Sequence, residues 1–176
     1  RGGESKFAAR GGGQGGNRGT RRADGGSVAL LGASVSNGGV LSAQLGSVAL
    51  AAGNAMALDV AGDGLLNVAV NQGAVNALVA NRGLIQADGG QVLLTAHSAG
   101  ALLQSAVNND GVIQAQTIQN HNGTIRLMGD MQSGTVNVGG TLDASAPTGG
   151  DGGFIETSAA HVTGSDNAIG TTQSAP

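Results

Sequence analysis

A five-residue motif that begins with glycine recurs along this chain and constrains its fold more than any other feature. The motif, G-x-V-x-L, occurs at residues 26–30, 46–50 and 90–94, with a conservative copy at 123–127. Alternating β-branched and aliphatic side chains favour a short strand. Glycine allows a sharp corner before the strand because it reaches positive φ without steric cost. Each copy therefore predicts one strand entered through a corner.

A second half-unit, N-x-G-h-h-x-A with h apolar, follows the same order. It occurs at residues 37–43, 81–87 and 109–115, and in residues 81–95 the two half-units lie side by side. Gly26 and Gly46 are 20 residues apart, which sets the shortest period. Longer separations later in the chain, such as the insert at 116–122, are expected to form loops, because surface loops lengthen at little cost.

A repeat of this length predicts a solenoid. A unit of about 20 residues with short strands cannot bury its own apolar face, but it can when it stacks on its neighbours. Aromatic rings supply much of an ordinary core, and Phe7 and Phe154 are the only two here. The core must therefore be thin and aliphatic. We predict an all-β fold, a parallel β-helix with about 20 residues per turn, looped-out inserts and turns about 4.8 Å apart.

Equivalent residues of successive turns are expected to stack in columns. The aliphatic residue of the first half-unit should point into the core. The asparagine should lie at a corner, where stacked amides hydrogen-bond along the column and tolerate left-handed backbone. Looser copies begin at Gly64, Gly134 and Gly153, and residues 99–107 fit either a helix or a strand. The predicted structural repeat positions are Val28, Val48, Val92, Ile125, Asn37, Asn81, Asn109, Gly39, Gly83 and Gly111.

The two ends of the chain differ from its middle. Residues 1–25 are rich in Gly and Arg without apolar periodicity, which predicts a flexible segment, with an RNA-binding arm as the alternative. Residues 1–22 carry a net charge of +5 and residues 23–176 one of −8, so the main body does not resemble a nucleic-acid binder. We expect the β-helix at 26–160 and a frayed or truncated end at 161–176.

No constellation of residues predicts catalysis. Cysteine is absent, and the three histidines are not spaced as metal ligands. The aspartates lie mostly beside glycine, as turn residues do. We therefore expect no enzyme activity, no cofactor, no metal and no small-molecule substrate. Asn122 begins the sequence Asn-Gly-Thr and is a candidate glycosylation site. No run of about 20 apolar residues is present, which argues against a membrane-spanning helix.

Three runs of this sequence resemble the filamentous haemagglutinin family, large exoproteins that Gram-negative bacteria export by two-partner secretion. They are ADGGSVALLGASVSNGGVLSAQLGSVALAAGNAMALD, ANRGLIQADGGQVLLTA and GGTLDASAPTGGDGGFIETSA. The resemblance covers about residues 23–160 and implies a right-handed β-helix that is secreted or displayed on the cell surface. It also implies an outer-membrane transporter as partner. The family's Asn-Pro-Asn motifs are absent and residues 1–22 depart from its pattern, so the region resembles the end of the secretion domain or the segment just after it.

The resemblance also implies a function. We expect a structural and adhesive shaft segment of a large exoprotein, with receptors on host-cell or bacterial surfaces. One alternative is an exoprotein that binds haem or haemopexin for haem acquisition. The other is the shaft of a contact-dependent toxin delivery protein.

Overall fold

The regular elements are strands throughout the part of the chain that the structure describes. A computed structural model describes residues 6–9, 13–60, 66–100 and 103–173. In these ranges the strands are numbered β1 to β20, and no helix is long and apolar enough to cross a membrane.

Eighteen of the strands form three parallel sheets of six strands each. The first sheet contains β1 (Lys6–Ala9), β4 (Ser27–Gly32), β7 (Ser47–Ala52), β12 (Gln91–Ala96), β15 (Thr124–Met128) and β18 (Phe154–Ser158). The second contains β2 (Gln14–Asn17), β5 (Ser34–Asn37), β10 (Leu78–Asn81), β13 (Ser105–Asn109), β16 (Gly134–Val138) and β19 (His161–Gly164). The third contains β3 (Thr20–Arg22), β6 (Val40–Ser42), β11 (Leu84–Gln86), β14 (Val112–Gln114), β17 (Thr141–Asp143) and β20 (Ile169–Thr171).

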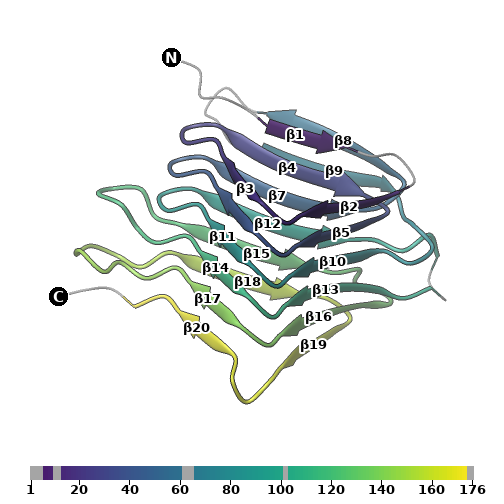
Figure 1. Ribbon diagram of the computed structural model, residues 1–176. Helices are drawn as coiled ribbons and strands as arrows, with labels where there is room; N and C mark the ends of the chain where they lie inside the picture. Colours follow the sequence, from purple (N-terminus) through teal and green to yellow (C-terminus); the bar gives the residue numbers. More distant parts are fainter. Residues whose placement is uncertain (1–5, 10–12, 61–65, 101–102, 174–176) are drawn as a thin grey trace.

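Each turn of the chain gives one strand to each sheet, and each sheet is a stack of such strands (Figure 1). The predicted parallel β-helix is therefore confirmed. In the first sheet, the register pairs Val28 with Val48, Val48 with Val92 and Val92 with Ile125. All four side chains are at most 1% exposed. A valine column from the second sheet and a column of leucine and isoleucine from the third meet them, so the core is a narrow aliphatic stack.

A hairpin covers the outside of the first sheet. It consists of β8 (Ala55–Val60) and β9 (Leu66–Gln72), which pair antiparallel. Met56, Val68 and Val70 pack against a small second cluster on the outer face of β4 and β7, which contains Ala29, Leu31, Ala49 and Ala51. β4 and β7 are thus buried on both faces, which explains why their side chains are apolar without alternation.

Two of the looser repeat copies expected from the sequence differ in the structure. Gly64, the predicted start of a looser repeat copy, lies outside the described residues, and residues 66–72 after it pair antiparallel in β9. The copy expected at Gly134 is also different: this strand pairs with β13 in the second sheet rather than with the first sheet. Within 99–107 the described residues include the start of β13 at Ser105, so the strand alternative is correct there.

The first predicted boundary is wrong, because strands already form within residues 1–25. β1, β2 and β3 pair in register with β4, β5 and β6 and build a complete first turn. The reason is that a parallel ladder joins backbone groups and needs no apolar side chain: Gly15 and Gly16 occupy the same places as Val35 and Ser36. Beyond residue 160, β19 and β20 continue the second and third sheets with exposed side chains.

Candidate functional site: the asparagine corner and the face beside it

The corner between the second and third sheets is built on a column of buried asparagines. Asn17 Nδ2 donates to Asn37 Oδ1 over 2.9 Å, and Asn37 Nδ2 donates to Asn81 Oδ1 over 2.9 Å. Asn81 Nδ2 continues the chain of bonds to Asn109 Oδ1 over 2.8 Å. None of the four side chains is more than 5% exposed. The column spans 20, 44 and 28 residues of sequence between successive members, so it fixes the register across inserts of different length.

The glycine two residues after each asparagine completes this corner. Each asparagine Nδ2 also donates to the carbonyl oxygen of that glycine, for example Asn81 to Gly83 over 3.3 Å. A Cβ on Gly83 would lie 2.1 Å from the carbonyl oxygen of Gly39, and one on Gly111 would lie 2.2 Å from that of Gly83. Successive turns therefore approach so closely here that only glycine fits, which gives the N-x-G pattern its physical meaning.

Sequence reasoning missed the first member of this column. Asn17 lies in the segment 1–25 that the sequence predicts to be flexible, yet Asn17 and Gly19 repeat the N-x-G spacing 20 residues before Asn37. At the other end the column stops, because Val138 pairs with Asn109 in the next turn. Asn109 Nδ2 keeps the two backbone contacts that the other members also make, here with the carbonyl oxygens of Gly111 and Thr141, both over 3.3 Å.

The corner between the third and first sheets is polar and carries carboxylates. The Asp88 carboxylate, 8% exposed, accepts from Gln86 Nε2 over 2.7 Å, Gln114 Nε2 over 2.9 Å and the backbone N–H of Gln116 over 2.9 Å. These amide donors come from successive turns. Asp88 therefore holds turns together as a hydrogen-bond acceptor, without a cationic partner among the described residues.

Two other carboxyl groups at this corner have a pKa below the usual value. Burial raises the pKa of Asp143, but hydrogen bonds from Ser145 and from Gln116 Nε2 outweigh it and lower the pKa overall. The pKa of Asp24 is lowered chiefly by the hydrogen bond from Arg22, whose Nε lies 2.6 Å from Asp24 Oδ2. Both groups are thus stabilised as carboxylates, which suits an acceptor role in the turns.

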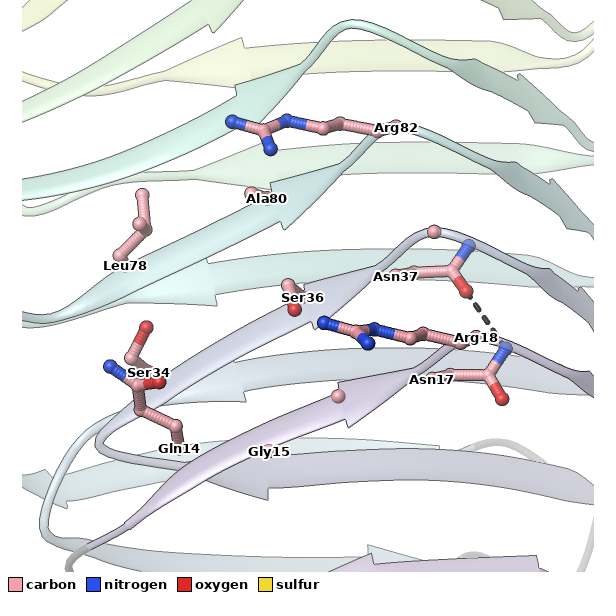
Figure 2. Close-up of a pocket in the computed structure, with 12 residues that line it drawn as sticks. Gln14, Gly15, Asn17, Arg18, Ser34, Ser36, Asn37, Leu78, Ala80 and Arg82 are labelled. Carbon is pink, nitrogen blue, oxygen red and sulfur yellow. Dashed lines mark hydrogen bonds between the residues drawn. The ribbon is translucent and has the colours of Figure 1, made fainter.

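The outer face of the second sheet, beside the asparagine corner, carries a shallow groove of about 700 Å³. Apart from Leu78, its floor consists of small and polar residues of β2, β5 and β10, and Arg18 and Arg82 extend from the corner across this face (Figure 2). The residues that line it are Gln14, Gly15, Gly16, Asn17, Arg18, Ser34, Ser36, Asn37, Gly38, Leu78, Ala80 and Arg82.

The structure places the remaining candidate residues apart from one another. His121 and His161 are exposed, and His97 Nδ1 lies 3.7 Å from Asp130 Oδ2. The described residues contain no group of three or more His, Cys, Asp or Glu side chains able to hold a metal ion. Asn122 is exposed in the connection between β14 and β15. The buried repeat positions therefore make structural contacts, and the groove is one hollow on the surface of the described residues.

Comparison with known proteins gives one match. The family profile of the TPS (two-partner secretion) secretion domain matches residues 11–144. Neither the curated proteins nor the solved structures gave a match. The match covers the secretion domain itself, whereas the sequence resemblance predicts a position at the end of that domain or just after it. The match also begins at residue 11, inside the segment 1–25 that the sequence predicts to be flexible. This agrees with the strands β2 and β3 found there.

The matched range contains β2 and β3 of the first turn, the hairpin and the whole asparagine column. Domains of this family lead an exoprotein across the outer membrane of Gram-negative bacteria, and a partner transporter in that membrane recognises them. The chain belongs to the TPS secretion domain family, typical of two-partner secretion exoproteins like filamentous haemagglutinin.

Proposed function

We propose that this secretion domain is also a segment of the structural, adhesive shaft of a large haemagglutinin-like exoprotein. The observation that carries the proposal is the continuous column of Asn17, Asn37, Asn81 and Asn109. A buried hydrogen-bonded column gives a solenoid a fixed register, and a fixed register gives a stiff rod.

A rod of this kind suits binding through extended faces rather than enclosed pockets. Tight small-molecule sites depend largely on aromatic side chains, and the whole sequence has only Phe7 and Phe154. We therefore propose a non-catalytic protein that contacts host-cell or bacterial surface receptors weakly at each site. Many weak contacts along the exoprotein would add through effective concentration. Exposed Asn122 is the proposed site if the shaft is glycosylated.

Export is tested by co-expressing the chain with its transporter in a Gram-negative host and measuring the protein in the medium. Adhesion is tested with beads coated with residues 1–176 at increasing density and added to cultured epithelial cells, with albumin-coated beads as control. We expect adherence to rise steeply with density, while the soluble chain competes poorly. Absence of adherence at every density would contradict the adhesive role.

A haem titration separates the adhesive role from haem acquisition. We expect binding no tighter than micromolar, since the histidines lie apart. A one-to-one site of nanomolar affinity that is lost on His97→Ala or His121→Ala would favour haem acquisition instead.

A further inference from the structure

We infer that Asn122 is a site of spontaneous deamidation, at which the backbone nitrogen of Gly123 attacks the Asn122 side chain, ammonia leaves, and aspartate or isoaspartate remains at residue 122. The sequence contains two Asn-Gly pairs, Asn37-Gly38 and Asn122-Gly123. The fold closes the first pair and leaves the second open. We therefore expect the second pair to react in the folded protein while the first is protected.

The reaction needs no partner other than water. The Gly123 nitrogen forms a bond to Cγ of Asn122, and the side-chain amide leaves as ammonia together with the proton of the Gly123 N–H. The product is a five-membered succinimide, and water then opens it. Breaking the bond to Cγ restores the ordinary main chain with an aspartate, whereas breaking the original peptide bond gives isoaspartate. Attack within one chain is favoured because the two groups are already neighbours.

Both reacting groups of the second pair are free of hydrogen bonds. The Asn122 side chain is exposed, and no hydrogen bond joins it to another described residue. The Gly123 carbonyl oxygen accepts from the backbone N–H of Phe154 over 3.0 Å, but the Gly123 N–H donates to none of the residues that the structure describes. The nucleophilic nitrogen and the amide that it attacks are thus both available.

The length of this corner explains why the Gly123 N–H is unbonded. In a short corner, the glycine before the first-sheet strand donates to the alanine three residues earlier, as Gly90 does to Ala87 over 2.9 Å. Residues 116–122 separate Gly123 from the corresponding alanine, Ala115. The backbones still approach closely, because a Cβ on Gly123 would overlap the carbonyl oxygen of Ala115. The packing therefore requires glycine, which is also the residue that hinders the attack least.

The first pair is held in the asparagine column. Asn37 Oδ1 accepts from Asn17 Nδ2, Asn37 Nδ2 donates to Asn81 Oδ1, and the side chain is 1% exposed. The Gly38 N–H donates to the carbonyl oxygen of Asn17 over 2.8 Å. Attack at Asn37 would require this corner to open, and buried hydrogen-bonded segments open rarely.

Asn120 separates the effect of exposure from the effect of the neighbouring nitrogen. Its side chain is exposed, like that of Asn122, and it lies in the same loop. The residue after it, His121, carries a side chain, and its backbone N–H donates to the carbonyl oxygen of Ile118 over 2.9 Å. Asn120 therefore has an accessible amide without a free nitrogen beside it, and we expect it to persist.

Deamidation competes with glycosylation for the same residue. A glycan would be attached to the side-chain nitrogen of Asn122, which the reaction expels as ammonia. The loop packs against the preceding turn, since a Cβ on Gly89 would lie 3.3 Å from the Cβ of His121. The reaction thus removes the glycan acceptor and adds a negative charge to the corner that already holds Asp88 and Asp143.

Peptide mapping by mass spectrometry tests the inference after prolonged incubation of residues 1–176 at neutral pH. Trypsin cleaves after Arg22, Arg82 and Arg126, so the two Asn-Gly pairs fall in different peptides. In water enriched in heavy oxygen, each residue that reacts is labelled because water supplies its new oxygen. We expect labelling at residue 122 to be at least about a hundredfold faster than at residue 37, and residue 120 to stay unlabelled on the same timescale. An enzyme that methylates isoaspartate should modify the same site.

Two controls separate the chemistry from the fold. In guanidinium chloride, Asn37 should react about as fast as Asn122, because only the folded corner protects it. Asn122→Gln keeps an exposed amide but would have to form a six-membered ring, so residue 122 should stay unlabelled while the unfolding midpoint stays that of the parent.

Slow labelling of residue 122 in the folded protein, with rapid labelling of both pairs in guanidinium chloride, would show that the folded loop protects Asn122 and would overturn the inference. Equal labelling of residues 120 and 122 in the folded protein would also overturn it, because exposure alone would then decide the rate and the free Gly123 nitrogen would have no part.

Discussion

Asn81 is the residue whose replacement should do most to loosen the corner. It accepts from Asn37 and donates to Asn109, and its side chain is fully buried. Asn81→Ala would remove the amide acceptor of Asn37 Nδ2, which would keep only its longer bonds to backbone carbonyls, and the amide donor to Asn109 Oδ1. Unsatisfied buried groups of this kind cost about 1–3 kcal/mol each, so we expect a loss of about 3 kcal/mol in the free energy of unfolding, measured with urea.

Asn137 provides the matched control for that change. Its Nδ2 donates to Asn108 Oδ1 over 2.7 Å, but this pair lies half-buried on the outer face of the second sheet. Water can replace the missing partner there, so Asn137→Ala should cost less than about 1 kcal/mol. Equal losses of unfolding free energy for Asn81→Ala and Asn137→Ala would show that burial of the asparagine column adds nothing to stability.

The carboxyl group of Asp143 should make the stability of the folded protein depend on pH in the acid range. Its pKa in the folded protein is lower than the ordinary value of 3.8. A lowered pKa means that the folded state prefers the carboxylate, so the stabilisation is present above about pH 4 and is lost as the pH falls through the folded-state pKa. We expect the melting temperature of Asp143→Asn to fall less steeply than that of the parent between pH 4 and pH 2. Parallel curves would contradict the role given to Ser145 and Gln116.

The strands of the first sheet have one face in the core, and Val92 tests which face it is. Val92 is 1% exposed and lies between Val48 and Ile125. Val92→Asp would bury an unpaired carboxylate, and we expect it to cost about 4 kcal/mol, comparable to the stability of a marginal domain. The adjacent Leu93 is only half-buried and pairs with Arg126, so Leu93→Asp should be tolerated. A thermal melt of both variants decides the assignment.

The elements that could be predicted from the sequence are those in which side chains repeat. Val28, Val48 and Val92 follow glycine in the same motif, so the strands of the first sheet can be predicted from the sequence alone. The hairpin of β8 and β9 could not be predicted in this way, because its sequence does not follow the repeat. Met56 and Val70 instead pack it against the outer face of the first sheet. Gly134 shows the opposite failure: its strand fits the first motif, but its register is set by Ser105 in the second sheet.

At the scale of the whole molecule, the first turn closes one end of the stack. Its inward positions hold Gly15 opposite Val35 and Arg21 opposite Leu41, where later turns hold apolar side chains. Polar terminal units of this type shield the core of repeat proteins from water. The same residues hide the turn from sequence analysis, since glycine and arginine give no apolar period. Only the N-x-G spacing of Asn17 and Gly19 could have revealed it.

Deleting residues 1–22 distinguishes a flexible end from a closing turn. A flexible segment, as the sequence predicts, could be removed without changing the melting temperature. The structure gives a different expectation, because Val28, Val35 and Leu41 are fully buried and would lose the turn that covers them. Partial exposure of each should cost roughly 1 kcal/mol. Asn37 Oδ1 would also lose the donor Asn17.

We therefore expect residues 23–176 to unfold at a clearly lower urea concentration than residues 1–176. The full chain with Arg18→Gln and Arg22→Gln is the control, because it removes charge and keeps the backbone ladder of the first turn. That control should unfold close to the parent. If residues 23–176 unfold with the parent's midpoint, the first turn adds no stability and the boundary at residue 25 holds. If the urea midpoint of the control falls as far as that of the deletion variant, then charge rather than coverage of the core stabilises this end of the molecule.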